Sequence, residues 1–335
     1  MKIAVLSPIS WRTPPRRYGP WEQVASNIAE GLVDAGHDVT LFATEDSVTS
    51  GRLESICRHP CSEDNTLDPK VWECLHIANL MEHSDEFDII HNNFDFLPLT
   101  YSKLIKPPML TTIHGFSSPE ILPVYKKYND NNAYVSISDA DRSPELSYVA
   151  TVYNGIKIDE FTFNDQGGDY LLFFGRIHPD KGTYEAIQIA QKSGLRLIIS
   201  GLIQDRNYFK ERVEPYLNEN ILFIGNSGPE KRNRLLGGAL ALLHPINFEE
   251  PFGLSVAEAM ICGTPVIAFN KGSMPELIRH SKTGFIVESV NEAADAVTAV
   301  NTINRIECRD WAVKNFSQEK MIDSYIKIYD QIVNL

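Results

Sequence analysis

The sequence lacks a long apolar run. None of its apolar stretches approaches the ~20 consecutive apolar residues of a membrane-spanning helix. Residues 1–6 lead straight into a strand-like pattern, without the apolar core and small-residue cleavage site of a signal peptide. We therefore expect a cytoplasmic protein. Association with a membrane stays open as an alternative, although the pattern does not indicate it.

Positive charge is scarce. The chain has 31 Lys and Arg against 44 Asp and Glu, a net charge of −13. A nucleic-acid partner is not expected, because binding the phosphate backbone requires clustered Lys and Arg. One basic cluster stands out in the first loop, at Arg12, Arg16 and Arg17. It is open to two interpretations, a solvated loop or a contact with an anionic acceptor or a membrane face.

Cysteine is also sparse, with five residues. An odd number in a chain of cytoplasmic type argues against a disulfide framework. Five residues of zinc-binding type fall close together, but their Cys-x-His-x-Cys start does not match the common Cys-x2-Cys knuckle. Ordinary packing is therefore favoured over a metal site at Cys57, His59, Cys61, Cys74 and His76.

Three familiar fingerprints are missing. The first strand is not followed by Gly-x-Gly-x-x-Gly, and the chain contains no Gly-x4-Gly-Lys-Ser/Thr loop. It also has no Gly-x-Ser-x-Gly nucleophile elbow. Dinucleotide-dependent oxidoreductases, P-loop nucleotide hydrolases and α/β-hydrolases are therefore poorly supported.

Short apolar runs alternate with segments of helical period, in two successive blocks. This alternation predicts an α/β protein with two doubly wound, Rossmann-like domains facing across a cleft, each with a largely parallel sheet. We expect domains at 1–160 and 161–310, a linker at 159–169, and a terminal helix over 311–335 that packs back on the first domain. Strands are expected at 3–7, 39–43, 87–91, 109–113, 134–136, 151–153, 170–174, 195–200, 221–224, 240–244 and 265–269, and helices at 22–35, 184–193, 208–217, 231–236, between 254 and 263, and from 309.

One loop of the second block combines glycine with two cations. Gly175 follows the strand at 170–174 and lets the backbone approach a ligand closely. Arg176 and Lys181 lie on the same loop, and the helix that follows presents its positive N-terminal end. The loop therefore predicts a diphosphate contact. The alternative is an exposed loop with two solvated cations.

Two glutamates stand in an otherwise apolar stretch, Glu250 and Glu258, with seven residues between them. Burying them is costly unless they are paired. A hydroxyl-rich ligand offsets that cost, because carboxylates accept its protons in charge-assisted hydrogen bonds. For Glu258 the alternative is a capping box, Ser255-x-x-Glu258, in which it satisfies only backbone N–H groups. The backbone of residues 252–254, at the start of a helix, predicts a seat for an anion.

His114 closes the strand at 109–113, directly before Gly115. Side chains at the carboxyl end of a parallel strand reach the ligand site, so His114 is a candidate contact for a sugar hydroxyl. A buried structural histidine is the alternative.

Together these residues resemble the retaining glycosyltransferases of family four, which have the GT-B fold. The resemblance covers both halves and is most specific in the second. It is carried by the Gly-Arg-x5-Lys-Gly run at 175–182, Glu250-x7-Glu258, and the segments 263–267, 272–276, 283–287, 36–39, 114–115 and 153–156.

The resemblance implies transfer of a sugar from a nucleotide-sugar donor to a hydroxyl, with retained anomeric configuration and without a cofactor or metal. A UDP-sugar is our first expectation and GDP-mannose the second. The acceptor would be a small molecule, a glycan or a lipid-linked hydroxyl. An epimerase or phosphorylase of the same fold, and a sugar-nucleotide-binding protein without activity, are alternatives.

The resemblance also implies individual roles. Arg176 and Lys181 neutralise the donor diphosphate. Glu250 holds hydroxyls of the donor sugar, and His114 contacts its 6-hydroxyl. Glu258 binds the ribose. The implied donor contacts also include Gly19, Gly175, Gly225, Asn154, Phe252, Gly253 and Leu254.

The first loop departs from the family pattern. Where the family has paired glycines, this chain has Gly19 followed by Pro20, which removes one N–H donor. A phosphate contact through that N–H is therefore in doubt. Trp21, Glu22 and Arg16 are candidate acceptor contacts, although Trp21 and Glu22 also fit the first turn of a helix.

Overall fold

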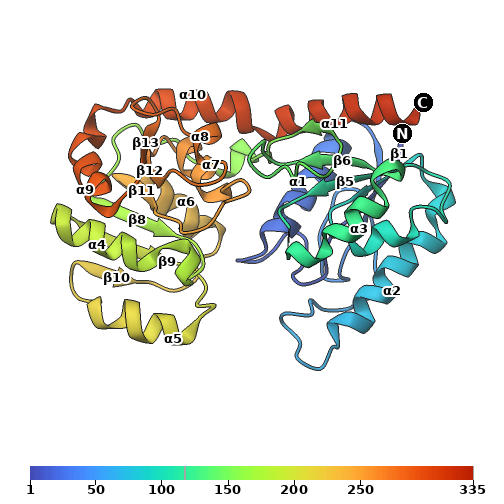
Figure 1. Cartoon of the computed structure of the whole chain (residues 1–335), viewed down its shortest axis with the longest axis horizontal. Coiled ribbons are helices and arrows are strands. Elements are labelled where there is room, and N and C mark those ends of the chain that lie inside the picture. The colour runs from blue at the N-terminus through green and yellow to red at the C-terminus, as the bar shows by residue number, and fades with distance from the viewer. Residues whose placement is uncertain (117, 335) are drawn as a thin grey trace. The chain divides into compact units, whose positions relative to one another are not determined.

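The chain forms two compact units (Figure 1). The computed structural model describes residues 1–116 and 118–334. One unit is Met1–Gly155 together with the chain from Gln318 onward, and the other is Ile156–Ser317. We call them the N-terminal and C-terminal units. The chain crosses between them at 155/156 and 317/318, where boundaries at 160/161 and 310/311 were expected. The stretch 159–169 lies inside the C-terminal unit.

The N-terminal unit is built on a parallel sheet of order β3-β2-β1-β4-β5-β6-β7. β7 begins three residues before the strand expected at 151–153. Three further elements of this unit, β3, α2 and α3, were not predicted. The strands are β1 (Lys2–Leu6), β2 (Asp38–Phe42), β3 (Arg52–Glu54), β4 (Ile89–Asn92), β5 (Met109–Ile113), β6 (Ala133–Ser136) and β7 (Tyr148–Thr151), and the helices are α1 (Pro20–Asp34), α2 (Pro69–Glu82), α3 (Leu122–Lys127) and α11 (Gln318–Val333).

The C-terminal unit repeats the plan with the parallel order β10-β9-β8-β11-β12-β13. One helix was expected at 208–217. The structure has a single α-helical turn at Arg206–Tyr208, followed by a π-helical segment at Phe209–Val213. The strands are β8 (Tyr170–Phe174), β9 (Arg196–Ser200), β10 (Ile221–Phe223), β11 (Ala241–His244), β12 (Val266–Phe269) and β13 (Gly284–Val287), and the helices are α4 (Thr183–Ser193), α5 (Arg206–Tyr208), α6 (Pro229–Gly238), α7 (Leu254–Ile261), α8 (Met274–Leu277), α9 (Val290–Ala299) and α10 (Arg305–Phe316).

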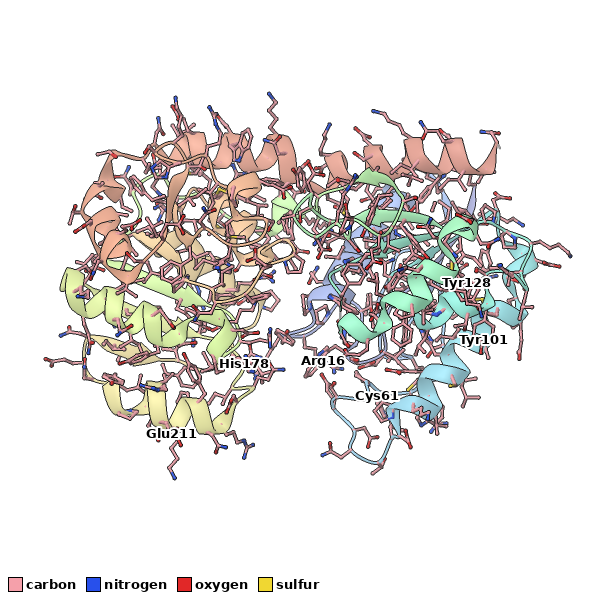
Figure 2. The ribbon with its side chains drawn as sticks, in the orientation of Figure 1. Arg16, Cys61, Tyr101, Tyr128, His178 and Glu211 are labelled. Carbon is pink, nitrogen blue, oxygen red and sulfur yellow. The ribbon has the colours of Figure 1, made fainter. Side chains whose placement is uncertain are left out.

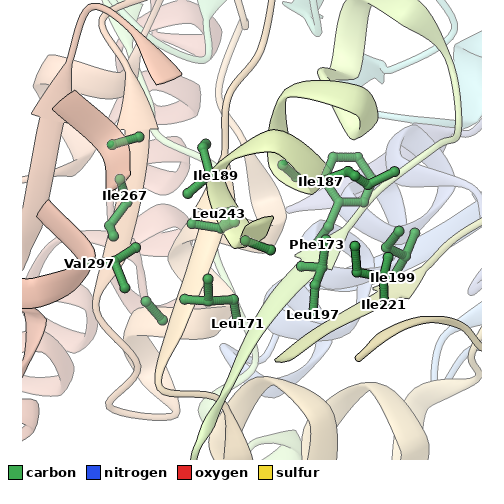
Figure 3. Close-up of a cluster of buried hydrophobic side chains, with 14 of the residues drawn as sticks. Leu171, Phe173, Ile187, Ile189, Leu197, Ile199, Ile221, Leu243, Ile267 and Val297 are labelled. Carbon is green, nitrogen blue, oxygen red and sulfur yellow. The ribbon is translucent and has the colours of Figure 1, made fainter. Parts of the chain in front are cut away.

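The core of the C-terminal unit explains why its strands read as continuous apolar runs. Leu171, Leu172 and Phe173 are consecutive in β8 and all buried. Because neighbouring side chains of a strand point to opposite faces, both faces of the sheet are covered, as in other parallel sheets. Figure 3 shows one side, where Leu171 and Phe173 pack with Ile187 of α4 and Val297 of α9.

The strand order places the ligand edge. In each unit the order reverses beside a central strand, at β1/β4 and at β8/β11. Loops that leave the carboxyl ends of two such strands run apart and open a crevice between them. The loops after β8 and β11 carry Arg176, Lys181 and Glu250, so the topology brings these three residues to one place.

The C-terminal segment is two helices rather than the single helix expected over 311–335. Ser317 is extended, with φ −74° and ψ 154°, and separates α10 from α11. The Ile156 N–H donates to the Phe316 carbonyl at 2.8 Å, so the chain leaves this unit beside the point where it entered. α10 packs on α7, and α11 packs on α1 of the N-terminal unit. In residues 1–116 and 118–334, no helix is both long and apolar enough to span a bilayer.

A buried polar chain fastens α11 to the sheet of the N-terminal unit. His91 is within 2.6 Å of the Tyr329 hydroxyl and 2.7 Å of the Thr112 hydroxyl, and Thr112 lies 2.8 Å from the Tyr325 hydroxyl. All four side chains are fully buried. Buried polar groups without partners are costly, so this chain fixes how α11 lies against β4 and β5.

We expect Tyr329→Phe to lower the free energy of unfolding by about 1–3 kcal/mol, because it leaves His91 Nδ1 without its partner in a site closed to water. Urea denaturation of the variant and the wild type measures this difference. Tyr101→Phe is the control, since Tyr101 (Figure 2) is partly buried and no hydrogen bond of its hydroxyl is found in the described part of the chain. Equal stability of Tyr329→Phe and Tyr101→Phe would contradict the role of this polar chain.

Candidate active site

The centre of the site is an ion pair between the loops after β8 and β11. Lys181 Nζ lies 2.5 Å from Glu250 Oε2, and His244 Nε2 lies 3.5 Å from the same oxygen. Lys181 also stands over the Phe248 ring, 4.3 Å from its centre. The Lys181 and Glu250 side chains are only 14% and 11% exposed. The sequence predicted both residues as donor ligands, and the structure adds that they touch each other.

This pairing keeps Glu250 ionised. Burial by itself would raise the pKa of the carboxyl, but the Lys181 ammonium and His244 outweigh burial and lower the pKa to about 2. Burial lowers the pKa of His244, so that imidazole is neutral and donates a hydrogen bond at most. Glu250 is therefore a fixed negative charge and a weak base.

Glycine is required at two positions for this contact to form. Gly182 has φ 72°, and a Cβ there would lie 1.8 Å from the Pro245 carbonyl oxygen. Gly272 has φ 53°, and a Cβ there would lie 2.3 Å from both the N and the O of Glu250. The Ser273 N–H donates to the Glu250 carbonyl at 2.9 Å. The backbone of Glu250 is thus held by a turn that no larger residue allows.

Arg176 lies in the same loop as Lys181 and is held by neutral and acidic partners. Its guanidinium donates to the Gln204 side chain and, at 3.3 Å, to Asp180 Oδ2. His178 (Figure 2) approaches the other Asp180 oxygen at 2.6 Å. The Gly175 N–H donates to the Ser200 carbonyl at 3.1 Å, which joins the loop start to the end of β9. An anionic ligand would have to compete with Asp180 for Arg176.

Glu258 is buried on α7 and paired with a residue that the sequence did not single out. It is 5% exposed, and Arg232 Nη1 of α6 lies 3.2 Å from its Oε1. The capping-box interpretation is wrong, because α7 begins at Leu254 behind Gly253, so Ser255 is inside the helix. Gly253 adopts the left-handed conformation, with φ 91°. Burial raises the pKa of Glu258, the Arg232 guanidinium opposes that rise, and Glu160 adds to it.

A hollow of about 510 Å³ lies between the loops that follow β9 and β10. Ser200 Oγ donates to the Gly225 carbonyl at 2.9 Å and lies 2.8 Å from Ser227 Oγ, which fixes the turn along one rim. Gly225, one of the donor contacts that the resemblance implies, belongs to the lining of the hollow. The hollow is lined by Gly201, Leu202, Ile203, Arg206, Phe209, Phe223, Gly225 and Asn226.

In the N-terminal unit, His114 is a neutral buried histidine. Burial lowers its pKa to about 3. With its proton on Nε2, it donates to Asn93 Oδ1 at 2.9 Å, and Nδ1 is then an acceptor without a partner in the described part of the chain. The Trp21 ring lies 5.8 Å from the imidazole, centre to centre. Nδ1 of neutral His114 can therefore accept a hydrogen bond from a ligand. Asn154, another predicted donor contact, is buried on the segment after β7.

The three candidate acceptor contacts differ in their surroundings. Glu22 is 2% exposed and accepts from the Trp11 N–H at 3.0 Å, which ties the first loop to the first turn of α1. Arg16 (Figure 2) is 52% exposed and pairs with Asp46 at 2.9 Å and Glu63 at 2.8 Å. The helix begins behind Gly19, so Trp21 and Glu22 lie in its first turn.

The five residues of zinc-binding type do not assemble. Cys57 Sγ donates to the His59 carbonyl at 3.1 Å, and His76 Nε2 contacts the Ser7 carbonyl at 2.9 Å. Within residues 1–116 and 118–334, no group of three or more His, Cys, Asp or Glu side chains is arranged to hold a metal ion.

Comparison with known proteins agrees with this geometry. The sequence profile of the glycosyl transferases group 1 matches residues 156–329, and that of glycosyltransferase family 4 matches residues 21–143. The chain belongs to the group 1 glycosyltransferases. It is therefore a glycosyltransferase, an enzyme that transfers a sugar from a nucleotide-sugar donor. Its two Rossmann-like units are those of the GT-B fold.

Several known proteins match this glycosyltransferase over nearly its whole length. An uncharacterized glycosyltransferase of Methanocaldococcus jannaschii is 22% identical and covers 95% of this chain and 93% of its own. A sucrose-phosphate synthase from Thermosynechococcus elongatus has a TM-score of 0.82 at 18% identity, over 100% and 99% of the two chains. Anabaena HepE in complex with UDP-glucose has a TM-score of 0.75 at 20% identity, over 99% and 100%.

Sequence reasoning missed several residues around the predicted ones. His244 ends a central strand, a position that in a parallel sheet signals a ligand site, so it could have been found. Asp180 lies inside the Gly175–Gly182 loop that the sequence singled out. Arg232 has no such signal, because it is one of several charged residues in the polar first half of α6.

Lys181→Met should lower the free energy of unfolding by about 3–5 kcal/mol, because it leaves Glu250 as an unpaired buried charge. The double variant Lys181→Met/Glu250→Gln should recover much of that loss. Lys126→Met is the control, since Lys126 and Glu145 are also 2.5 Å apart but half exposed, and exposed pairs contribute at most about 1 kcal/mol. Urea denaturation measures all three variants, and similar losses in Lys181→Met and Lys126→Met would contradict the buried pair.

The buried carboxyl of Glu22 should make the free energy of unfolding depend on pH. Burial raises its pKa from 4.5 to about 7. Between these values the folded chain holds a proton that the unfolded chain releases, so this contribution to stability falls as pH rises from 4.5 to about 7 and stays low above it. Glu22→Gln should therefore gain melting temperature relative to wild type between pH 5 and pH 8, as thermal denaturation across that range measures. A pH-independent difference would show that Glu22 does not titrate there.

Proposed function

We propose that the protein is a metal-independent retaining glycosyltransferase that moves a sugar from a nucleoside-diphosphate sugar to a hydroxyl. A UDP-sugar is the first candidate donor and GDP-mannose the second. The acceptor is a small molecule, a glycan or a lipid-linked hydroxyl. The observation that carries the proposal is the cluster of Arg176, Lys181 and Glu250 at the β8/β11 edge, which offers cations to a diphosphate and a carboxylate to sugar hydroxyls.

Lys181 can serve both partners at once. An ammonium has three N–H donors, and one of them is directed at Glu250. No other hydrogen bond of Nζ is found in the described part of the chain, so the other two N–H groups can meet phosphate oxygens. Arg176 adds a planar guanidinium, which binds phosphate with two parallel hydrogen bonds. As the bond to the sugar breaks, negative charge grows on the leaving diphosphate, and fixed cations in a poorly solvated site stabilise that charge most strongly.

Glu250 acts as a hydroxyl ligand in this proposal, and not as a nucleophile or general base. Retaining glycosidases use a carboxylate nucleophile, but Lys181 and His244 both approach Glu250 Oε2 and its pKa is about 2. The other oxygen, Oε1, is offered to sugar hydroxyls. The acceptor hydroxyl then passes its proton to an oxygen of the leaving diphosphate and attacks the anomeric carbon from the face that the diphosphate leaves.

The nucleoside is assigned to the edge of the same sheet. The hollow beside Gly225 has room and flat apolar surface for a base, with Phe209 and Phe223 in its lining. Glu258 takes the ribose hydroxyls, and His114 of the N-terminal unit is retained as the contact of the sugar's 6-hydroxyl. Uracil is the first candidate base, in keeping with the UDP-glucose bound by the Anabaena protein.

A thermal-shift screen of UDP, GDP and their sugars tests the donor. A ligand that binds only the folded state raises the melting temperature by mass action, so the preferred base gives the largest shift. We expect UDP or a UDP-sugar to give it. No shift with any nucleoside diphosphate or its sugar would overturn the proposed function.

Lys181→Ala should reduce turnover by ~10²–10³-fold, which is the scale of removing one group that stabilises transition-state charge. Lys192→Ala is the matched control, because Lys192 is exposed in the last turn of α4. Initial rates are measured with saturating donor. Wild-type turnover in Lys181→Ala would sink the assignment.

A further inference from the structure

Arg232 is a largely buried cation held between an aromatic ring and two carboxylates. Its guanidinium carbon lies 5.1 Å from the centre of the Phe161 ring. Nη1 is 3.2 Å from Glu258 Oε1, and Nη2 is 4.0 Å from Glu160 Oε2. The Arg232 side chain is 14% exposed, and Glu160 is far more exposed than Glu258. The stronger and shorter contact is therefore the one to Glu258.

Glu258 depends on this cation. Its neighbours in α7, Val256, Ala257 and Ala259, are fully buried and apolar. Of the charged groups that face it, Arg232 stabilises the carboxylate and Glu160 opposes it. Burial also raises the pKa of the nearby Cys262 thiol to about 12, so that thiol is neutral and supplies no charge. Without Arg232, the remaining influences all favour the protonated carboxyl.

Protonation matters for the ligand that the proposed function assigns to Glu258. An ionised carboxylate only accepts hydrogen bonds, through both oxygens, whereas a carboxylic acid turns one oxygen into a donor. Two neighbouring ribose hydroxyls are best received by a carboxylate, because hydrogen bonds to an ionised acceptor are about twice as strong as neutral ones.

We infer that Arg232 is a positioning residue for the donor nucleotide, which holds the Glu258 carboxylate as the acceptor of the ribose hydroxyls. The inference rests on the proposed function, because it takes Glu258 to be the ribose ligand. It adds a residue that touches neither donor nor acceptor and acts only through Glu258.

The placement of α6 supports this role. α6 (Pro229–Gly238) starts directly after the turn at 225–228, which borders the hollow assigned to the base. Its other end is fixed by Arg305, which donates to the carbonyls of Gly237 at 2.9 Å and Ala239 at 3.0 Å. α6 thus connects the segment 225–228, beside the proposed base site, to the end held by Arg305, and Arg232 lies between these two points.

The test uses two ligands that differ only at the ribose, UDP and 2′,3′-dideoxyuridine 5′-diphosphate, or the matching guanosine pair if GDP is preferred. Their affinities are measured by calorimetry on the full chain. The variants are Arg232→Met, which keeps an apolar stem over Phe161, and Arg232→Lys, which keeps the charge. Arg234→Met is the control, because Arg234 is exposed on the same helix. Glu258→Gln serves as the reference for a lost carboxylate.

We expect wild type and Arg234→Met to prefer UDP over its dideoxy analogue by the same factor. Arg232→Met should lose ~10-fold or more of its UDP affinity, the scale of losing hydrogen bonds to a charged acceptor, with little change for the dideoxy analogue. Its UDP affinity should recover toward alkaline pH as Glu258 ionises, and Arg232→Lys should be intermediate. A purely structural Arg232 would instead weaken both ligands equally, at every pH.

The outcomes separate the two claims. If wild type prefers UDP, Glu258→Gln abolishes that preference and Arg232→Met keeps it, the inference about Arg232 is wrong and the proposed function stands. Equal weakening of both ligands in Arg232→Met also overturns the inference. If wild type binds UDP and its dideoxy analogue equally, the ribose assignment of Glu258 fails first, and the role of Arg232 fails with it.

Discussion

Two opposite charges, the Lys181 ammonium and the Glu250 carboxylate, lie 2.5 Å apart where little water reaches either of them. A buried ion pair contributes little net stability, since removing two charges from water costs about as much as their attraction returns. The ion pair instead fixes the positions of the two side chains. Breaking it is costly, so each charge keeps the other at the carboxyl ends of β8 and β11. The transferase site proposed for the C-terminal unit depends on that mutual constraint.

The contact between Lys181 and Glu250 requires glycine at two neighbouring backbone positions. Gly182 and Gly272 stand where a Cβ would strike Pro245 or the Glu250 backbone, so the two loops meet only with glycine at both positions. Glu258 repeats the same solution with a different cation, Arg232. The two carboxylates end in different electrostatic states, because Glu250 has a strongly lowered pKa and Glu258 a raised one. One is a permanent charge, whereas the other is ionised only as far as Arg232 allows.

The sequence was enough to predict the parallel α/β fold, because runs such as Leu171–Phe173 are apolar on both faces and end at glycine or charged residues. It also predicted Arg176, Lys181 and Glu250 as donor ligands, since these side chains lie in the loops that follow predicted strands. It did not predict that Lys181 and Glu250 touch, or that Arg232 reaches Glu258, because both contacts join segments far apart in the chain. The break at Ser317 was not predicted either, since neither glycine nor proline marks it in the sequence. Ser317 bridges to Ile156, which lies far away along the chain.

The most direct test of the central claim, that protein cations rather than a metal ion neutralise the leaving diphosphate, is the transfer rate of enzyme stripped of metal. Initial rates with the preferred nucleotide sugar are compared in excess chelator, with and without added Mg²⁺ or Mn²⁺. Arg176 and Lys181 supply fixed positive charge, so the predicted rate is the same in chelator as with metal. Loss of activity in chelator, restored by adding the divalent cation, would contradict the claim.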